Sequence, residues 1–227
     1  MKGTTGGSAL SNNYQSERPF WVCPNPLRLL CVEHGHKVQV PCGRWRTCRA
    51  CQVRKEGELR SRFLAGITTP PEHPRKPMFF TLTFPESQAP SESEAQLCWR
   101  RLVGYLRHPS REHLGEYGWV LQRQKNGTLH FHGVAQLPWF ADGLAEWRQL
   151  IEQAGFGVQN KLVAALPQHA GYCASYISKS LAQLEPGRRA YGFSRAFPKA
   201  DAVLSREERD RLLANLGAAS ECEWWIT

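Results

Sequence analysis

Residues 119–137 have the sequence WVLQRQKNGTLHFHGVAQL, and this stretch decides the fold. Apolar residues lie on both sides of Asn126-Gly127, a pair that favours the tight turn of a β-hairpin. We therefore expect two antiparallel strands, Trp119–Gln124 and Thr128–Leu137.

The turn of this hairpin permits two registers. A two-residue turn pairs Arg123 with His130. A three-residue loop that begins at Lys125 places Gly127 in the left-handed conformation of a G1 bulge and pairs Gln122 with His130. The sequence leaves both registers open.

Outward from the hairpin, the chain alternates strand and helix patterns. Upstream, Met78–Phe84 is β-branched and aromatic and predicts a strand, while Ser91 and Glu94 form a capping box for a helix that ends near His108. The downstream elements that we expect are a helix capped by Asp142, a strand at Val158–Leu166, a helix at Gln168–Leu184 and a charged amphipathic helix from Ser205 to about Gly217. This mixed order predicts an α+β domain with helices packed on a mostly antiparallel sheet.

Composition restricts the class of protein. The 227 residues include 29 Lys and Arg against 20 Asp and Glu, which gives a formal net charge of +9. This excess suits a phosphate backbone, although a basic solvated surface would have the same composition. No apolar run approaches the ~18 residues of a membrane span. Residues 1–17 lack the apolar core of a signal peptide, so we expect a disordered N-terminus and a cytoplasmic protein.

The first chemical motif is His130-Phe131-His132. Residues i and i+2 of a strand point to one face, so both imidazoles project together and can hold one metal ion. In the three-residue register, the carboxamide of Gln122 can complete a hard-metal site. The alternative is two incidental polar residues on a half-exposed strand.

The second motif lies on the expected helix after residue 167. Tyr172, Tyr176 and Lys179 stand at i, i+4 and i+7 and therefore share one helix face. A tyrosine acts as a covalent nucleophile when a nearby cation favours its ionised form. The alternative is that these tyrosines are packing residues with polar tips.

The third motif is a cysteine cluster: five of the eight cysteines lie between Cys23 and Cys51. In a cytoplasmic chain such clustering favours a metal over disulfides. Cys48 and Cys51 enclose two residues, as in a zinc knuckle, and Cys42 and Cys23 would complete four thiolates around a structural zinc. Three further residues compete for the fourth position: Cys31, His34 and His36.

These segments follow one another in the order of a known family. They are Pro41-Cys42-Gly43 with its neighbouring cysteines, Phe79–Phe84, His130–His132, Tyr172–Lys179 and Arg188–Arg195. Together they resemble the HUH endonuclease superfamily, specifically the rolling-circle replication initiators of microviruses and filamentous phages. The resemblance implies an HUH/RRM-like antiparallel sheet preceded by a small zinc module.

The resemblance also implies an activity and its residues. Such proteins nick single-stranded DNA at a replication origin with Mg²⁺ or Mn²⁺ and form a 5′-phosphotyrosine intermediate. Carried over to this chain, the metal ligands are His130, His132 and Gln122, and Tyr176 is the principal nucleophile with Tyr172 and Lys179 assisting. Many relatives have a glutamate where this chain has Gln122, and Glu116 is the fallback ligand. Because Ser175 replaces a lysine, only Tyr176 keeps a Tyr-x-x-Lys spacing.

The expected partners and boundaries complete this interpretation. DNA phosphates would contact arginines near the cysteines and after the tyrosine helix: Arg44, Arg46, Arg49, Arg188, Arg189 and Arg195. No Gly-x-x-x-x-Gly-Lys-Ser/Thr stretch is present, so unwinding would need a host helicase, and a host DNA polymerase would extend the nick. The expected domains are a disordered 1–18, a zinc module 19–65, a linker 66–77, an endonuclease domain 78–200 and a helical tail 201–227.

Two other functions fit the same residues. A relaxase or single-strand transposase uses similar groups, but the two-tyrosine spacing and the cysteine leader favour the replication initiator. A non-catalytic, zinc-dependent DNA-binding or regulatory protein would also retain these motifs, and Gln122 and Ser175 keep that alternative open.

Overall fold

The computed structural model describes residues 22–31, 37–69, 75–85, 89–111, 113–138, 140, 144–180, 184–185, 187–199 and 224–226. The expected disordered N-terminus and the expected tail helix after Ser205 lie outside these residues. No helix in the described ranges has the length and apolar character needed to cross a membrane.

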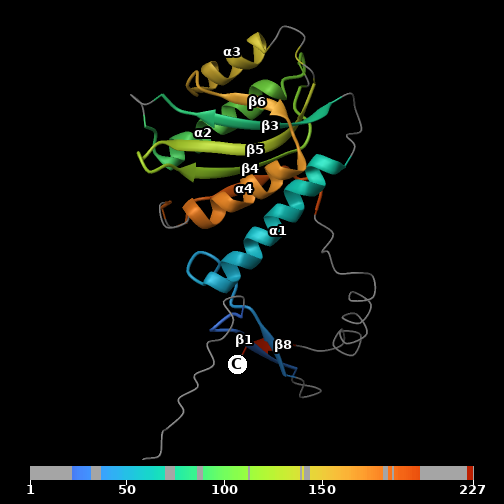
Figure 1. The fold of residues 1–227 in the computed structure, drawn as a ribbon, viewed down its shortest axis with the longest axis vertical. Helices are drawn as coiled ribbons and strands as arrows, with labels where there is room; N and C mark the ends of the chain where they lie inside the picture. Colours follow the sequence, from blue (N-terminus) through green and yellow to red (C-terminus); the bar gives the residue numbers. More distant parts are fainter. Residues whose placement is uncertain are drawn as a thin grey trace, which may run out of the picture.

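An antiparallel sheet of five strands is the centre of the described fold (Figure 1). Its spatial order is β6-β3-β5-β4-β7, and every neighbouring pair is antiparallel. Its strands are β3 (Lys76–Thr83), β4 (Tyr117–Arg123), β5 (Leu129–Leu137), β6 (Lys161–Ala164) and β7 (Tyr191–Phe193). A separate small sheet contains β1 (Leu27–Cys31), β2 (Lys37–Val40) and β8 (Trp224–Ile226).

The β4–β5 hairpin adopts the three-residue register. Gln122 lies opposite His130, and the backbone N–H of Gln124 donates to the carbonyl of Thr128 at 2.8 Å. Gly127 has φ +88°, a left-handed conformation that costs glycine little because it has no Cβ. The glycine therefore selects the longer loop, and this register puts Gln122 on the same face as the histidines.

Four helices pack on the sheet within the described ranges, which confirms the expected α+β architecture. They are α1 (Arg49–Thr68), α2 (Glu92–Leu106), α3 (Ala145–Ala154) and α4 (Pro167–Ser180). The capping box of Ser91 and Glu94 is present at the start of α2. In contrast, α3 begins after Leu144, whose φ of +77° is left-handed, while the expected cap Asp142 lies outside the described residues.

Alternation along β5 separates two differently covered faces. Phe131 points to the face covered by α2, where Trp99 stacks on it and on Phe80 at 5.6 and 5.4 Å between ring centroids. His130 and His132 point to the other face, which we call the histidine face. Helices α1 and α4 lie side by side on this face (Figure 1).

Helix α1 joins the cysteine-rich segment to the sheet. It begins directly after Cys48, and its Leu59 and Phe63 are completely buried. It continues to Thr68, and β3 begins at Lys76, so the connection between them is shorter than the expected linker 66–77. The expected division between a zinc module and a nuclease domain remains a prediction.

Candidate functional site

The site is built on the histidine face from three strands and one helix. His130 and His132 come from β5, Gln122 from β4 and Thr81 from β3, which lies directly opposite His132. Phe131 is completely buried on the other face, so its packing fixes the direction of both histidines.

His132 is held on both ring nitrogens. Its Nδ1 lies 3.1 Å from the hydroxyl oxygen of Thr81, and its Nε2 lies 2.8 Å from Oε1 of Gln122. Only 3% of the residue is exposed. Burial lowers the pKa of His132 to about 3, and the neighbouring His130 lowers it further, so this imidazole is neutral at physiological pH.

His130 lies nearer to solvent at the end of the same strand. Its ring is nearly parallel to that of His132, with centroids 6.2 Å apart. Its Nδ1 lies 3.4 Å from the amide nitrogen of Gln124, and partial burial lowers the pKa of His130. A neutral imidazole is the form that binds metals.

The two tyrosines of α4 lie against His132. The ring of Tyr176 stacks on His132 at 4.4 Å between centroids, and Tyr172 meets it edge-on at 5.4 Å. Tyr172 is 44% exposed, whereas burial raises the pKa of Tyr176. The Nζ atom of Lys179 lies 5.3 Å from the ring centroid of Tyr176, so a cation stands beside this phenol.

Aromatic contacts from β3 position this helix. His169, in the first turn of α4, stacks on Phe79 at 4.3 Å, and Tyr172 meets the same ring edge-on at 5.6 Å. Cys173 and Ile177 are buried beneath the helix. The tyrosines are therefore part of a packed layer, and their hydroxyl groups are added chemistry on that layer.

The donor atoms of this site suit a small divalent cation. The Nε2 atom of His132 and Oε1 of Gln122 face each other, and a proton or a cation can join two such atoms. Thr81 can accept a proton from Nδ1, and this arrangement leaves the lone pair of Nε2 directed at Gln122. Glu116, the fallback ligand, is ruled out: it lies six residues before Gln122 on β4, ~20 Å along the strand, and it accepts a hydrogen bond from Ser194.

Two cavities flank the tip of the β4–β5 hairpin. One of about 530 Å³ is lined by Gln122, Gln124 and the cationic residues Lys125 and Lys179. The other, of about 620 Å³, lies on the side of β3 and includes His130 in its lining. The histidine-tyrosine site is therefore open to molecules at this edge of the sheet.

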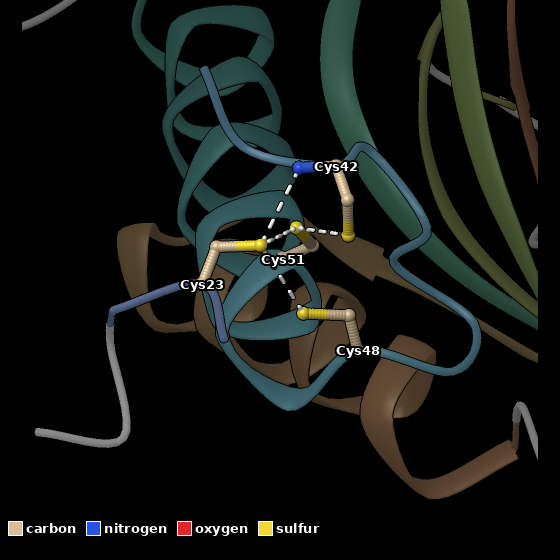
Figure 2. A group of neighbouring side chains, drawn as sticks. All are labelled: Cys23, Cys42, Cys48 and Cys51. Carbon is tan, nitrogen blue, oxygen red and sulfur yellow. Dashed lines mark hydrogen bonds between the residues drawn. The ribbon is translucent and has the colours of Figure 1, made fainter. Parts of the chain in front are cut away.

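The four expected cysteines converge in a second site (Figure 2). Cys48 precedes α1, Cys51 lies in its first turn, and Cys42 and Cys23 come from the segments around the small sheet. Sulfur–sulfur distances are 3.5 Å for Cys42–Cys51, 3.9 Å for Cys23–Cys48 and 4.0 Å for Cys23–Cys51. Zn–S bonds of about 2.3 Å in a tetrahedron put sulfurs about 3.8 Å apart, so the cluster could hold zinc.

The cysteine environments differ in polarity. The backbone N–H of Cys42 donates to the sulfur of Cys23, which lowers the pKa of that thiol to about 7, whereas burial raises the pKa of Cys51 to about 12. Of the competitors, the side chain of Cys31 lies outside the described part, as do His34 and His36. Cys23 is the described residue that completes the group of four.

The expected DNA-binding arginines have different surroundings. Arg46 donates to the backbone carbonyls of Glu185 and Arg188, so it joins the cysteine loop to the segment before β7. Trp45 reinforces this contact through the ring of Tyr191 at 5.8 Å. The others are exposed on the surface: Arg44, Arg49, Arg188, Arg189 and Arg195.

Thr81 and Gln124 are site residues that the sequence motifs did not single out. Both contact a histidine only because of the strand register, with Thr81 opposite His132 and Gln124 two residues beyond Gln122. A polar threonine inside the apolar strand at 78–84 was the available signal.

A family comparison agrees with this geometry. Residues 77–181 match the family model of the replication-associated protein ORF2, a range that runs from β3 to α4 and contains every residue of the histidine-tyrosine site. Through this domain the chain belongs to the family of phage rolling-circle replication initiators, whose members bind DNA and are nicking enzymes. No curated protein is significantly similar in sequence to this chain.

Proposed function

We propose that this protein is a rolling-circle replication initiator that nicks single-stranded DNA at a replication origin by a metal-dependent tyrosine transesterification. One observation carries the proposal: the imidazole of His132 contacts Gln122 at 2.8 Å and stacks on Tyr176 at 4.4 Å. A possible metal ligand and a possible nucleophile thus lie against each other in a domain of the initiator family.

The metal of this proposal is Mg²⁺ or Mn²⁺. The residues that would hold it are His130, His132 and Gln122, which offer two neutral nitrogens and one amide oxygen. When bound, such a cation polarises the scissile phosphate and balances the negative charge that develops on it.

The chemical step belongs to the tyrosines. The phenol oxygen of Tyr176 attacks the phosphorus, the bond from phosphorus to the 3′-oxygen breaks, and the phenol proton is replaced on the products by one on the 3′-hydroxyl. The products are a 5′-phosphotyrosine ester and a free 3′-hydroxyl. Lys179 favours the ionised phenol and so offsets the effect of burial on its pKa. Tyr172 serves the second transfer, which rejoins the displaced strand.

The remaining features serve DNA binding and replication. A structural zinc on Cys23, Cys42, Cys48 and Cys51 fixes the start of α1, and the exposed arginines contact phosphates. A host polymerase extends the 3′-hydroxyl and a host helicase unwinds the duplex, in the cytoplasm of a bacterial host.

Covalent trapping on single-stranded DNA tests the proposal. The full chain is incubated with oligonucleotides that tile its own replicon, with and without Mn²⁺, and adducts are identified by denaturing electrophoresis and peptide mapping. We expect a metal-dependent adduct that the His130→Ala/His132→Ala double variant does not form.

The result also separates the rival functions. A protein with zinc and origin DNA bound, but with no adduct on either tyrosine, would be a DNA-binding regulator. Full cleavage by the double histidine variant would exclude the metal site that we propose.

A further inference from the structure

The cavity of about 620 Å³ beside the hairpin has a lining that the nicking reaction does not use. It lies between the end of β3, the tip of the hairpin and the loop that precedes β6. His130 is the member of the proposed metal site that it contains. Anything bound in this cavity would therefore lie next to the scissile phosphate.

Hydrogen bonds to the end of β3 fix the wall of this cavity. The backbone N–H of Gly157 donates to the carbonyl of Thr83 at 2.8 Å, and the hydroxyl of Thr83 donates to the carbonyl of Gln159 at 2.6 Å. The side chain of Asn160 accepts from the backbone N–H of Thr83 at 2.9 Å. The loop is thus held in place before any ligand arrives, which lowers the entropy cost of binding.

The lining combines apolar surface with neutral amides. Phe84 and Phe156 pack together at 4.8 Å, and Val158 beside them is 78% exposed, which is unusual for a valine with no ligand. Gln124 and Gln159 add carboxamides, each with a donor and an acceptor.

The charges of the two cavities differ. Among the described residues that line the 620 Å³ cavity there is no Lys or Arg, and Glu152 adds a negative charge. The cavity across the hairpin contains Lys125 and Lys179. Phosphates therefore favour the cationic side, while a flat, uncharged group with hydrogen-bonding edges favours the amide side.

We infer that the 620 Å³ cavity binds an unstacked nucleobase of the DNA strand next to the scissile phosphate, with Gln159 contacting the edge of the base. The placement next to the scissile phosphate rests on the proposed function. The hairpin tip then divides the nucleotide, with its phosphate toward Lys179 and its base toward Gln159. Proteins that recognise single strands hold bases in this manner, by apolar contact on the ring and hydrogen bonds on its edge.

Binding without cleavage tests the inference. The probes are 12-nucleotide oligomers of dT, dC and dA and an abasic 12-mer of the same charge, titrated against the full chain by fluorescence anisotropy without added Mg²⁺ or Mn²⁺. The variants Gln159→Ala and Gln159→Leu remove the amide of an exposed side chain and keep the backbone carbonyl that accepts from Thr83. Gln153→Ala, an exposed glutamine of α3 outside the cavity lining, is the matched control.

We expect the wild type and Gln153→Ala to bind at least one base-bearing oligomer more tightly than the abasic one. Both Gln159 variants should lose about three- to tenfold of that preference with unchanged affinity for the abasic probe. An unchanged preference in both variants, or equal wild-type affinity for all four probes, would overturn the inference. Because no cleavage is measured, a failure to form the covalent adduct would refute the nicking function and leave this result independent.

Discussion

At the scale of single residues, the two tyrosines differ more in their surroundings than in their spacing. Tyr176 stacks on His132 beside Lys179, while Tyr172 is the more exposed phenol. We predict that Tyr176→Phe loses most of the first cleavage and its adduct, because the ring packing remains and only the hydroxyl is removed. Tyr172→Phe should still cleave but should rejoin strands poorly. Peptide mapping of the adduct decides the assignment, and an adduct found on Tyr172 alone would reverse it.

Thr81 is the second residue with a testable role, as the partner of His132 Nδ1. Thr81→Val keeps the shape and the strand preference but leaves the imidazole without this partner. Partners of metal-binding histidines contribute about 10- to 100-fold to metal affinity, so we expect a loss in that range for Mn²⁺. Titration of the Mn²⁺ electron paramagnetic resonance signal measures it.

The control for Thr81 is Thr68→Val, which removes a hydroxyl bonded to the carbonyl of Leu64 in α1. It should bind Mn²⁺ like the wild type. Unchanged Mn²⁺ affinity in Thr81→Val would mean that the strand alone orients the histidine.

At the scale of elements, an ion pair fixes the hairpin that carries Gln122 and His130. The guanidinium of Arg123 donates to Glu92 at 3.1 Å and to the carbonyl of Gly127 at 3.0 Å. Glu92 is completely buried and also accepts from the backbone N–H of Glu185. The pair therefore ties the hairpin to α2 and to the segment before β7.

We predict that Arg123→Met lowers the free energy of unfolding by about 3 kcal/mol, because it leaves a buried carboxylate without its cation. Adding Glu92→Gln should recover part of this loss. Arg188→Met breaks an exposed pair with Glu185 and should cost no more than about 1 kcal/mol. Urea unfolding followed by circular dichroism measures all three, and equal losses for the two arginine variants would contradict the assignment.

The elements also show where the sequence was sufficient. Alternation placed both histidines on one face, and helical spacing placed both tyrosines on one stripe, because these patterns follow from local backbone geometry. The hairpin register could not be chosen in advance, since it depended on Gly127 adopting a left-handed conformation. Thr81 could not be assigned to His132 without that pairing across strands.

Helix α1 is the element that the sequence analysis did not predict. Leu59, Phe63 and Ile67 are buried at i, i+4 and i+8, a helical spacing. The cysteine motif and the prolines that follow residue 69 drew the boundaries elsewhere. Helix ends depend on tertiary contacts, and here the contact is with α4 and the histidine face.

At the scale of the whole molecule, the cysteine cluster is connected to the sheet through Arg46 and Trp45. We predict about one zinc per purified chain by elemental analysis, and loss of that zinc in Cys51→Ser. Because the cysteine loop contacts the segment before β7, zinc loss should also speed amide hydrogen exchange at residues 190–193. Cys98→Ser, a thiol outside the cluster, is the control and should retain both properties. A metal-free chain that is fully folded would contradict the structural role.

The packing of α1 determines how this gene can be divided for expression. The ring of Phe193 lies over Gly118 of β4 and packs on Phe63 at 5.1 Å, and Phe197 packs on Phe63 in turn. A fragment cut at the family boundaries, residues 77–181, would omit this whole layer and leave apolar sheet surface in water. Each omitted side chain of this size removes about 1.5 to 3 kcal/mol of burial. We therefore predict that such a fragment collects in inclusion bodies, while a fragment spanning 22–199 is recovered as monodisperse protein by size-exclusion chromatography.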